Sequence, residues 1–149
     1  ALDHHGIAGP DVGRLLESGS IETENGVVVA GDVTRPRPGQ SFAFIMDTAP
    51  CAAAIELARG VDLMVAESTY LDSEVELAAD YRHLTAGQAA SMAVEAGARR
   101  LVLGHFSARY SDNAGFAAEA GAIHPDVVVA EDLAVVSVPT RLGDQAASG

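Results

Sequence analysis

Acidic and imidazole side chains directly follow three apolar runs of this 149-residue sequence. Asp47 follows the first run, Glu67 the second and His105 the third. If the runs are parallel strands of one α/β sheet, their carboxyl ends lie at one edge, where open sheets of this class bind ligands. We therefore expect the three side chains to meet in a single cleft.

The chemistry that such a cleft supports is metal-assisted hydrolysis. A further histidine, His83, lies two residues before Thr85, which is expected to cap a helix. Asp, Glu and His bind zinc or manganese and carry protons. A divalent ion lowers the pKa of bound water to about 7, and two ions stabilise both oxygens of a phosphoryl transfer. The pattern equally allows Asp47 as a turn former, Glu67 as a solvated strand end and two isolated loop histidines.

The elements that must position these residues alternate along the chain, which predicts an α/β layer architecture. The expected strands are 26–30, 42–46, 61–66, 100–103, 127–129 and 134–138, the last two forming a hairpin around Glu131 and Asp132. The expected helices are 12–17, 52–58, 72–81, 85–98 and 115–122.

Composition restricts the function classes. The formal charge of −12 opposes non-specific attraction to nucleic acid. Cys51 is the single cysteine, so an internal disulfide is excluded. No apolar run approaches the ~20 residues that span a bilayer, and no secretory signal is recognisable. These features predict a cytoplasmic protein that does not associate with membranes.

Four local sequences occur in the order typical of one family of hydrolases. They are Phe44–Cys51 (FIMDTAPC), Val65–Tyr70 (VAESTY), His83–Ala90 (HLTAGQAA) and Leu103–Tyr110 (LGHFSARY). They resemble Gly-Asp-Thr-Arg-Pro-Cys, His-Glu-Ala-Thr-Phe, His-Ser-Thr and Thr-His-Phe-Ser-x-Arg-Tyr of the ribonuclease Z family, the endonucleases that process tRNA 3′ ends. The resemblance covers residues 9–139. It implies that the chain is the carboxyl-terminal half of a metallo-β-lactamase αββα four-layer sandwich.

The resemblance also implies roles for the strand-end residues. Asp47 would bridge two zinc ions and His105 would bind one of them, with manganese as the alternative metal. His83 would be the catalytic histidine that protonates the leaving oxygen, and Glu67 would orient it as its acid–base partner. These roles make zinc, two ions per complete site, the expected cofactor.

The resemblance further implies that two residues in the segment after His105 bind the substrate. Ser107 and Arg109 would lie near the scissile phosphate of precursor tRNA. Arginine suits this role because its planar guanidinium can bond two phosphate oxygens.

The sequence departs from the family pattern in one central respect. The family's main metal motif, His-x-His-x-Asp-His, does not occur, and Asp47 with His105 are too few ligands for zinc. His4 and His5 adjoin where the family has intervening residues, so we expect a truncated or discontinuous chain. The expected organisation is a partial loop region over 1–20, the half-domain over 21–140 and a disordered tail over 141–149.

Three functional hypotheses follow. The first is a zinc-dependent endonuclease that removes the 3′ trailer from precursor tRNA, in a full-length protein whose missing amino-terminal half completes the metal site; the chain alone is expected to be inactive. The second is a metallo-β-lactamase-fold hydrolase of small esters, a sulfatase or cyclic-nucleotide phosphodiesterase. The third is an inactive fragment that dimerises. A homodimer is expected because half a sandwich exposes an apolar face. His4, His5 and His124 are expected at the surface or in turns, outside the site.

Overall fold

The computed structural model describes residues 2–35 and 39–140. Contacts within the chain divide it into two compact units, Ala1–Pro38 and Gly39–Gly149, which are described separately. The domain bounds expected at residues 20 and 140 stay a prediction, as does the break between His4 and His5. The tail expected over 141–149 lies outside the described residues. Within the described ranges, no helix has the length and apolar character needed to cross a bilayer.

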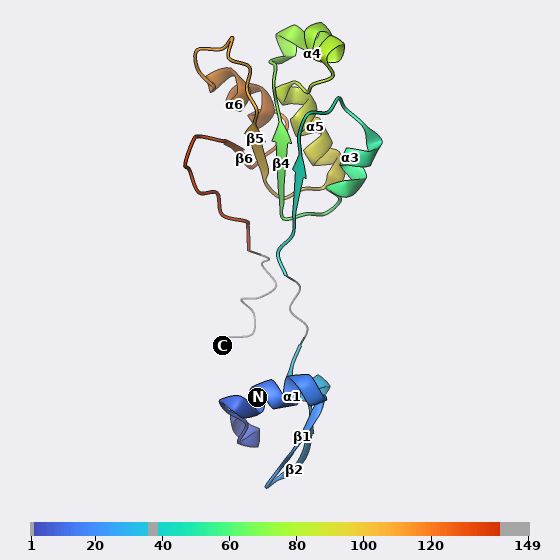
Figure 1. Cartoon of the computed structure of the whole chain (residues 1–149), viewed down its shortest axis with the longest axis vertical. Helices are drawn as coiled ribbons and strands as arrows, with labels where there is room; N and C mark the ends of the chain where they lie inside the picture. Colours follow the sequence, from blue (N-terminus) through green and yellow to red (C-terminus); the bar gives the residue numbers. More distant parts are fainter. Residues whose placement is uncertain (1, 36–38, 141–149) are drawn as a thin grey trace. The chain divides into compact units, whose positions relative to one another are not determined.

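The first unit combines short helices with a β-hairpin around a small apolar core (Figure 1). Its elements are η1 (Leu2–His5), α1 (Pro10–Ser18), β1 (Ser20–Thr23), β2 (Gly26–Val29) and α2 (Ala30–Val33). Pro10 suits the first turn of α1, where no backbone N–H is needed. Gly19 ends that helix with φ 79°, a left-handed conformation that glycine adopts without strain. The core consists of Ile7, Leu15 and Val28.

The second unit is built on a parallel sheet in the order β3-β4-β5-β6. Its strands are β3 (Phe42–Ile45), β4 (Leu63–Glu67), β5 (Leu101–Gly104) and β6 (Val127–Val129). Its helices are α3 (Ala52–Leu57), η2 (Asp72–Glu74), α4 (Val75–Tyr81), α5 (Ala86–Ala96) and α6 (Ala114–Gly121). Parallel strands need long crossovers, and helices supply them here. The α/β class predicted from the sequence is confirmed.

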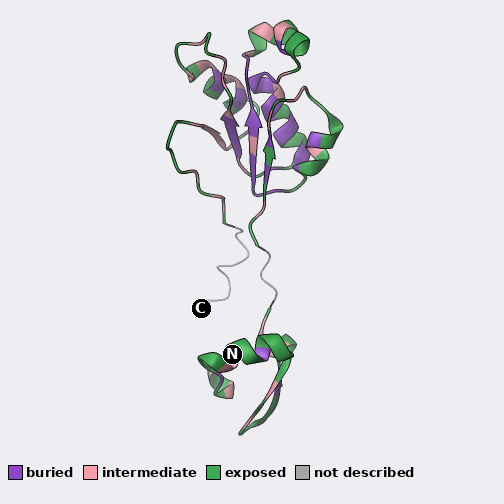
Figure 2. Cartoon of the chain, in the orientation of Figure 1, coloured by how far each residue is buried: buried purple, intermediate pink, exposed green. Residues whose placement is uncertain are grey.

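Helix α5 supplies much of the helical side of the core. Its inward residues are mostly alanines, which are fully or almost fully buried and allow a close approach to the sheet. Figure 2 shows buried residues concentrated along β4, β5 and this helix. The helix begins as predicted at Thr85, whose hydroxyl accepts the Gln88 N–H at 3.1 Å while the Gln88 side chain accepts the Thr85 N–H at 3.0 Å. This reciprocal cap fixes the start of α5 beside the loop that carries His83.

Strand β3 has one buried and one exposed face, both apolar. Ala43 and Ile45 are buried against the helices, whereas Phe42 and Phe44 are 66% and 61% exposed. Alternate side chains of a strand point to opposite faces of the sheet. An exposed apolar strand face is typical of a surface that another segment covers.

The strand predicted over residues 134–138 is wrong. The segment is irregular, and the carbonyl oxygens at its end accept hydrogen bonds from side chains. Gln40 Nε2 donates to Val138 O at 2.7 Å, and Arg100 donates through Nη1 to Ser137 O at 2.9 Å. The apolar alternation that suggested a strand leaves Leu133 and Val135 exposed. Side chains of other segments therefore bond these carbonyls, in place of the neighbouring strand that the predicted hairpin would have supplied.

Candidate metal centre

The register of the sheet brings the polar strand ends together. Glu67 at the end of β4 is in register with Gly104 at the end of β5, and His105 follows immediately. Asp47 comes two residues after the end of the neighbouring strand β3. Asp47 and His105 have φ values of 50° and 58°, a left-handed conformation that costs a non-glycine residue about 1–3 kcal/mol. Backbone strain of this kind is concentrated at functional sites.

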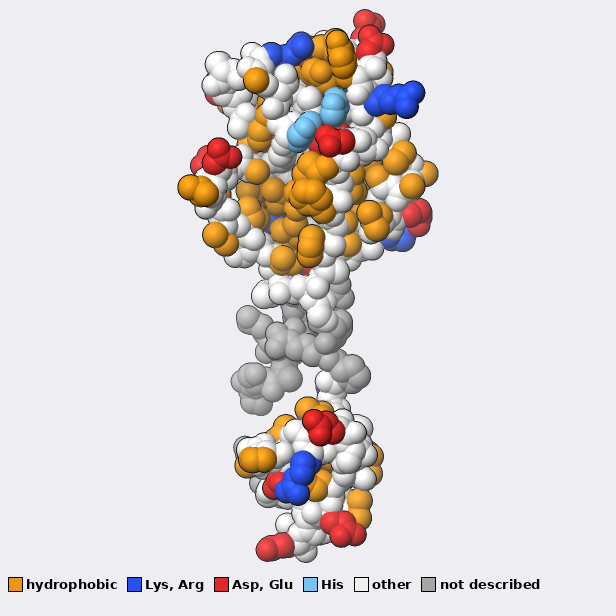
Figure 3. Space-filling model, in the orientation of Figure 1, with side chains coloured by type: hydrophobic (Ala, Val, Ile, Leu, Met, Phe, Trp, Pro, Cys, Tyr) orange, Lys and Arg blue, Asp and Glu red, His pale blue; other side chains and the backbone are white. Residues whose placement is uncertain are grey.

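Asp47, His83 and His105 form a cluster of possible metal ligands. One ligand atom from each lies within 4.8 Å of the others. Asp47 Oδ1 is 3.3 Å from His105 Nε2, and the two imidazole centroids are 5.3 Å apart. Histidine and acidic side chains lie together on one face of the second unit, beside an apolar area (Figure 3). The expected convergence of Asp47 and His105 is confirmed.

Glu67 lies beneath this cluster and is fully buried. Its carboxylate accepts hydrogen bonds from four residues: the Thr48 N–H at 2.6 Å, the Thr69 hydroxyl at 2.7 Å, His83 Nδ1 at 2.9 Å and the Leu84 N–H at 3.1 Å. Burial raises the pKa of Glu67, but these hydrogen bonds outweigh it and hold the pKa below its ordinary value. The interpretation of Glu67 as a solvated strand end is therefore wrong.

Thr69 links the buried carboxylate to His105, and the sequence analysis did not single it out. Its hydroxyl donates to Glu67, and its oxygen lies 2.8 Å from His105 Nδ1. A hydroxyl has one proton, so the second bond requires a proton on His105 Nδ1. This bond orients the ring and points Nε2 toward Asp47. The sequence could have pointed to Thr69, because it lies two residues after Glu67 in the segment Val65–Tyr70, which resembles a ribonuclease Z motif.

The donor set fits a cation. His105 Nε2 and a carboxylate oxygen of Asp47 face each other at 3.3 Å. With Nδ1 protonated, a neutral His105 presents a lone pair there, and two lone pairs repel unless a cation lies between them. A metal ion or a second proton on His105 satisfies this geometry. Carboxylate oxygen and imidazole nitrogen are ordinary zinc ligands, and a histidine ligand often donates its other N–H to a supporting group.

Arg109 and Ser107 lie on the loop after β5. Arg109 donates through Nη1 to Glu74 Oε1 at 2.5 Å, and its Cζ lies 5.2 Å from the centroid of the Tyr70 ring. The Ser107 N–H donates to the Thr69 carbonyl at 3.1 Å. Ser107 is thus tied to the segment that supports His105. Phosphate binding by either residue stays a prediction.

The remaining histidine of the second unit has a structural role. His124 was expected at the surface or in a turn; it is 3% exposed, so the surface position is wrong, and it lies in the connection between α6 and β6. Its Nδ1 accepts the Asp126 N–H at 3.1 Å, so its Nε2 carries the proton and donates to the Ala98 carbonyl at 3.0 Å. Both ring nitrogens are therefore used inside the fold.

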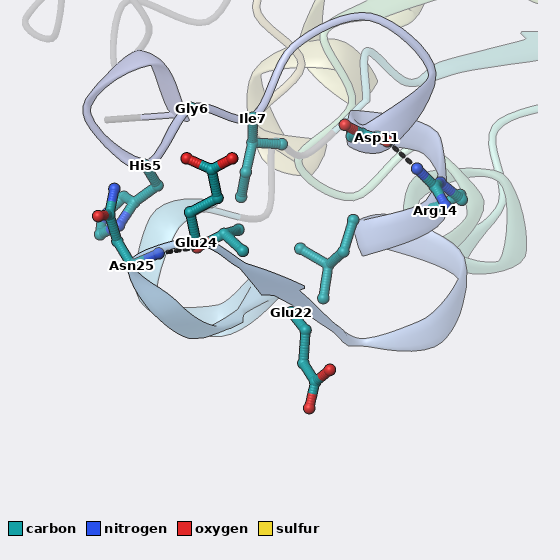
Figure 4. Close-up of a pocket in the computed structure, with 10 residues that line it drawn as sticks. His5, Gly6, Ile7, Asp11, Arg14, Glu22, Glu24 and Asn25 are labelled. Atoms are coloured by element: carbon teal, nitrogen blue, oxygen red, sulfur yellow. Dashed lines mark hydrogen bonds and ion pairs between the residues drawn. The ribbon is translucent and has the colours of Figure 1, made fainter.

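The first unit has a separate pocket of about 590 Å³ (Figure 4). Asp11 and Arg14 on its rim form an ion pair along α1. The carboxylate of Glu22 points away from the other labelled side chains in this view. No residue of the Asp47–His83–His105 cluster lines this pocket, so it is not part of the candidate metal centre.

Comparison with known proteins defines the class. Residues 14–106, more than half of the chain, match the model of the beta-lactamase superfamily domain, and the chain belongs to this family. The metallo-beta-lactamase fold protein YhfI from Bacillus subtilis is similar in structure, with a TM-score of 0.57 and 20% identity over 62% of this chain and 37% of that chain. At that identity the similarity shows the fold alone. The fold class predicted from the sequence, part of a metallo-β-lactamase domain, is confirmed.

The particular relatives are ribonucleases Z. The chain is 53% identical over 141 residues to ribonuclease Z of Salinispora arenicola, covering 94% of this chain and 46% of the relative. It is 40% identical over 134 residues to ribonuclease Z of Chlamydia muridarum, covering 90% and 44%. The crystal structure of human tRNase Z, short form, matches with a TM-score of 0.51 and 28% identity over 76% of this chain and 37% of that one. The resemblance stated from the motifs is confirmed, and the chain spans about half the length of the curated relatives it matches.

Proposed function

We propose that the protein containing this chain is a metal-dependent phosphodiesterase. The observation that carries the proposal is the approach of Asp47 and His105, just after two parallel strands, to His83 on the loop before α5, above an ionised and buried Glu67. Asp47 and His105 would hold the metal. A bound divalent ion would supply an activated water molecule and would stabilise negative charge on the phosphate oxygens.

The chain's own residues then handle the proton and the substrate. The Nδ1–H of His83 donates a hydrogen bond to the Glu67 carboxylate, so Nε2 is the nitrogen available to the reaction. A protonated Nε2 would pass its proton to the leaving oxygen, and the adjacent carboxylate would stabilise the imidazolium that carries it. Thr69 would keep His105 in the tautomer that a ligand requires.

The substrate that we propose is precursor tRNA with a 3′ trailer. Its support is the identity of about half of the aligned residues to proteins named ribonuclease Z. Arg109 and Ser107 would contact the scissile phosphate. Two zinc ions need more ligands than this cluster offers, so we propose that the rest of the protein provides them. A homodimer, a cytoplasmic location and an inactive isolated chain belong to the same proposal.

A hydrolase of small phosphodiesters or sulfate esters is the alternative. The formal charge of −12 favours it, because a polyanionic RNA is repelled by a strongly acidic surface. A small ester needs only the metal centre and not an extended basic surface.

The deciding experiment compares two substrates with the complete protein loaded with zinc. One is a precursor tRNA labelled at its 3′ trailer, and the other is bis-p-nitrophenyl phosphate. We expect a single endonucleolytic cut that releases the trailer, together with slower turnover of the small ester. Turnover of the small ester alone would contradict the tRNA assignment and support the alternative. Loss of both activities in Asp47→Ala is the control that ties them to this centre.

A further inference from the structure

Glu74, at the end of η2, receives two donors from the loop that follows β5. Arg109 donates to Glu74 Oε1 at 2.5 Å, and the Tyr110 hydroxyl donates to Glu74 Oε2. Arg109 and Tyr110 lie 35 and 36 positions after Glu74 in the sequence. One carboxylate therefore connects η2 with the loop that begins at His105.

The pairing fixes the guanidinium of Arg109 in a defined place. Its charge is held between the Glu74 carboxylate and the face of the Tyr70 ring, 5.2 Å from the centroid. The Tyr70 ring in turn lies 6.2 Å, centroid to centroid, from the His83 ring. Arg109 is thus separated from the metal cluster by one aromatic side chain. With a side chain 42% exposed and five N–H donors, it retains donors for a phosphate after bonding Glu74.

Tyr110 anchors the same loop from its inner side. Its hydroxyl accepts the Leu71 N–H at 3.0 Å while it donates to Glu74, and its ring packs edge-on against the fully buried Phe116 at 5.0 Å. The Tyr110 hydrogen bond, and then the bonds of Arg109, lower the pKa of Glu74 despite partial burial. Burial and the neighbouring carboxylate raise the pKa of Tyr110. Glu74 therefore stays ionised as the acceptor and Tyr110 stays protonated as the donor.

We propose that Glu74 is a positioning residue that holds Arg109 over Tyr70, where its free donors engage the phosphodiester. The inference rests on the proposed phosphodiesterase function and adds a residue that does not itself touch substrate. Two other roles make different predictions. A carboxylate that competed with the phosphate for Arg109 would inhibit the enzyme. A purely structural role, in which Glu74 only anchors Tyr110, would give the same loss whether or not Arg109 is present.

The test measures kcat and KM for a labelled precursor tRNA with the complete protein. Glu74→Ala is expected to lower kcat/KM by about 10- to 100-fold, the effect of a misplaced substrate-positioning group. Glu74→Gln, which keeps an acceptor oxygen, is expected to recover part of this loss. Glu76→Ala is the matched control, because it removes the same charge from an exposed position on the adjoining helix α4. That variant is expected to stay within about twofold of the wild type.

A double-mutant cycle separates positioning from structure. If Glu74 acts through Arg109, Glu74→Ala costs less than about twofold when introduced into Arg109→Ala. Equal losses with and without Arg109, or a higher kcat/KM in Glu74→Ala, would overturn the inference. A wild-type protein that cleaves no phosphodiester would instead overturn the proposed function, so the two failures are distinguishable.

Discussion

Each end of the parallel sheet carries a carboxylate beside a strand, but within the described residues the fold pairs the negative charge with a cation at one end only. Asp62, directly before β4, is buried with a side chain 1% exposed. It accepts Arg99 Nη1 at 3.0 Å and the Ser41 N–H at 2.9 Å. Its negative charge is therefore neutralised inside the fold.

Asp47, after β3, is the counterpart at the other end. Its side chain is 71% exposed and faces His105, a group that carries a charge only when doubly protonated. Arg109, on the adjacent loop, is already bonded to Glu74. A carboxylate is thus structural where the fold provides its counter-ion, and it is available for a cation from solution where the fold does not. Substitutions at each end of the sheet test that difference.

Removal of Asp47 should have the largest effect. In the complete protein, Asp47→Ala should lower turnover of the phosphodiester by more than about 100-fold, because it removes a proposed metal ligand and not a supporting residue. Zinc measured by elemental analysis should fall in parallel. Asp126→Ala is the control, since Asp126 pairs with Arg100 at the opposite end of the sheet. Retained zinc and turnover in Asp47→Ala would abolish the distinction between the two ends.

His83 tests whether the cluster contains a proton carrier in addition to ligands. His83→Ala should slow turnover by about 10²–10⁴-fold, the typical contribution of general acid–base catalysis. Zinc content should stay unchanged, because His83 is assigned to the proton and not to the metal. The spacing of the cluster also permits His83 as a ligand. Loss of zinc as complete as in Asp47→Ala would assign His83 to the metal.

Thr69 tests the hydrogen bonds that support His105. Thr69→Val keeps the shape of the side chain but removes the hydroxyl that connects Glu67 with His105 Nδ1. Zinc affinity or turnover should fall by about 10- to 100-fold, as for other residues that support a metal ligand. Thr69→Ser keeps the hydroxyl and should behave like the wild type. Equal losses in both variants would mean that packing, and not the hydrogen bond, is what matters.

The sequence alone predicted the features that follow from regular structure. Parallel strands end at one edge, so the approach of Asp47, Glu67 and His105 followed from three apolar runs and their final polar residues. The Thr85 cap followed from a threonine directly before a helix-like stretch, whereas the part of Gln88 in that cap was not foreseen. Both inferences need only local pattern and general sheet geometry.

Features that depend on distant partners were not predictable. The two donors of Glu74 lie 35 and 36 residues further along the chain, and Arg100 bonds a carbonyl 37 residues away where a strand was expected. His124 does not follow an expected strand, and nothing in the neighbouring sequence indicates that the Ala98 carbonyl will accept a hydrogen bond from its ring. Such contacts arise from the packing of whole elements, which the residue pattern does not specify.

Arg99 tests the structural end of the sheet and should affect stability alone. Arg99→Ala leaves the buried Asp62 without its guanidinium partner. We expect a loss of about 1–3 kcal/mol in the free energy of unfolding, below the full cost of breaking a buried pair because Arg99 is 37% exposed. Chemical denaturation measures it, and zinc content and kcat should be unchanged. Arg59→Ala removes an exposed pair with Glu56 and should leave the free energy of unfolding almost unchanged, because solvent screens that pair. If Arg99→Ala lowered zinc binding as Asp47→Ala does, the two ends of the sheet would be coupled and their carboxylates would not have separate roles.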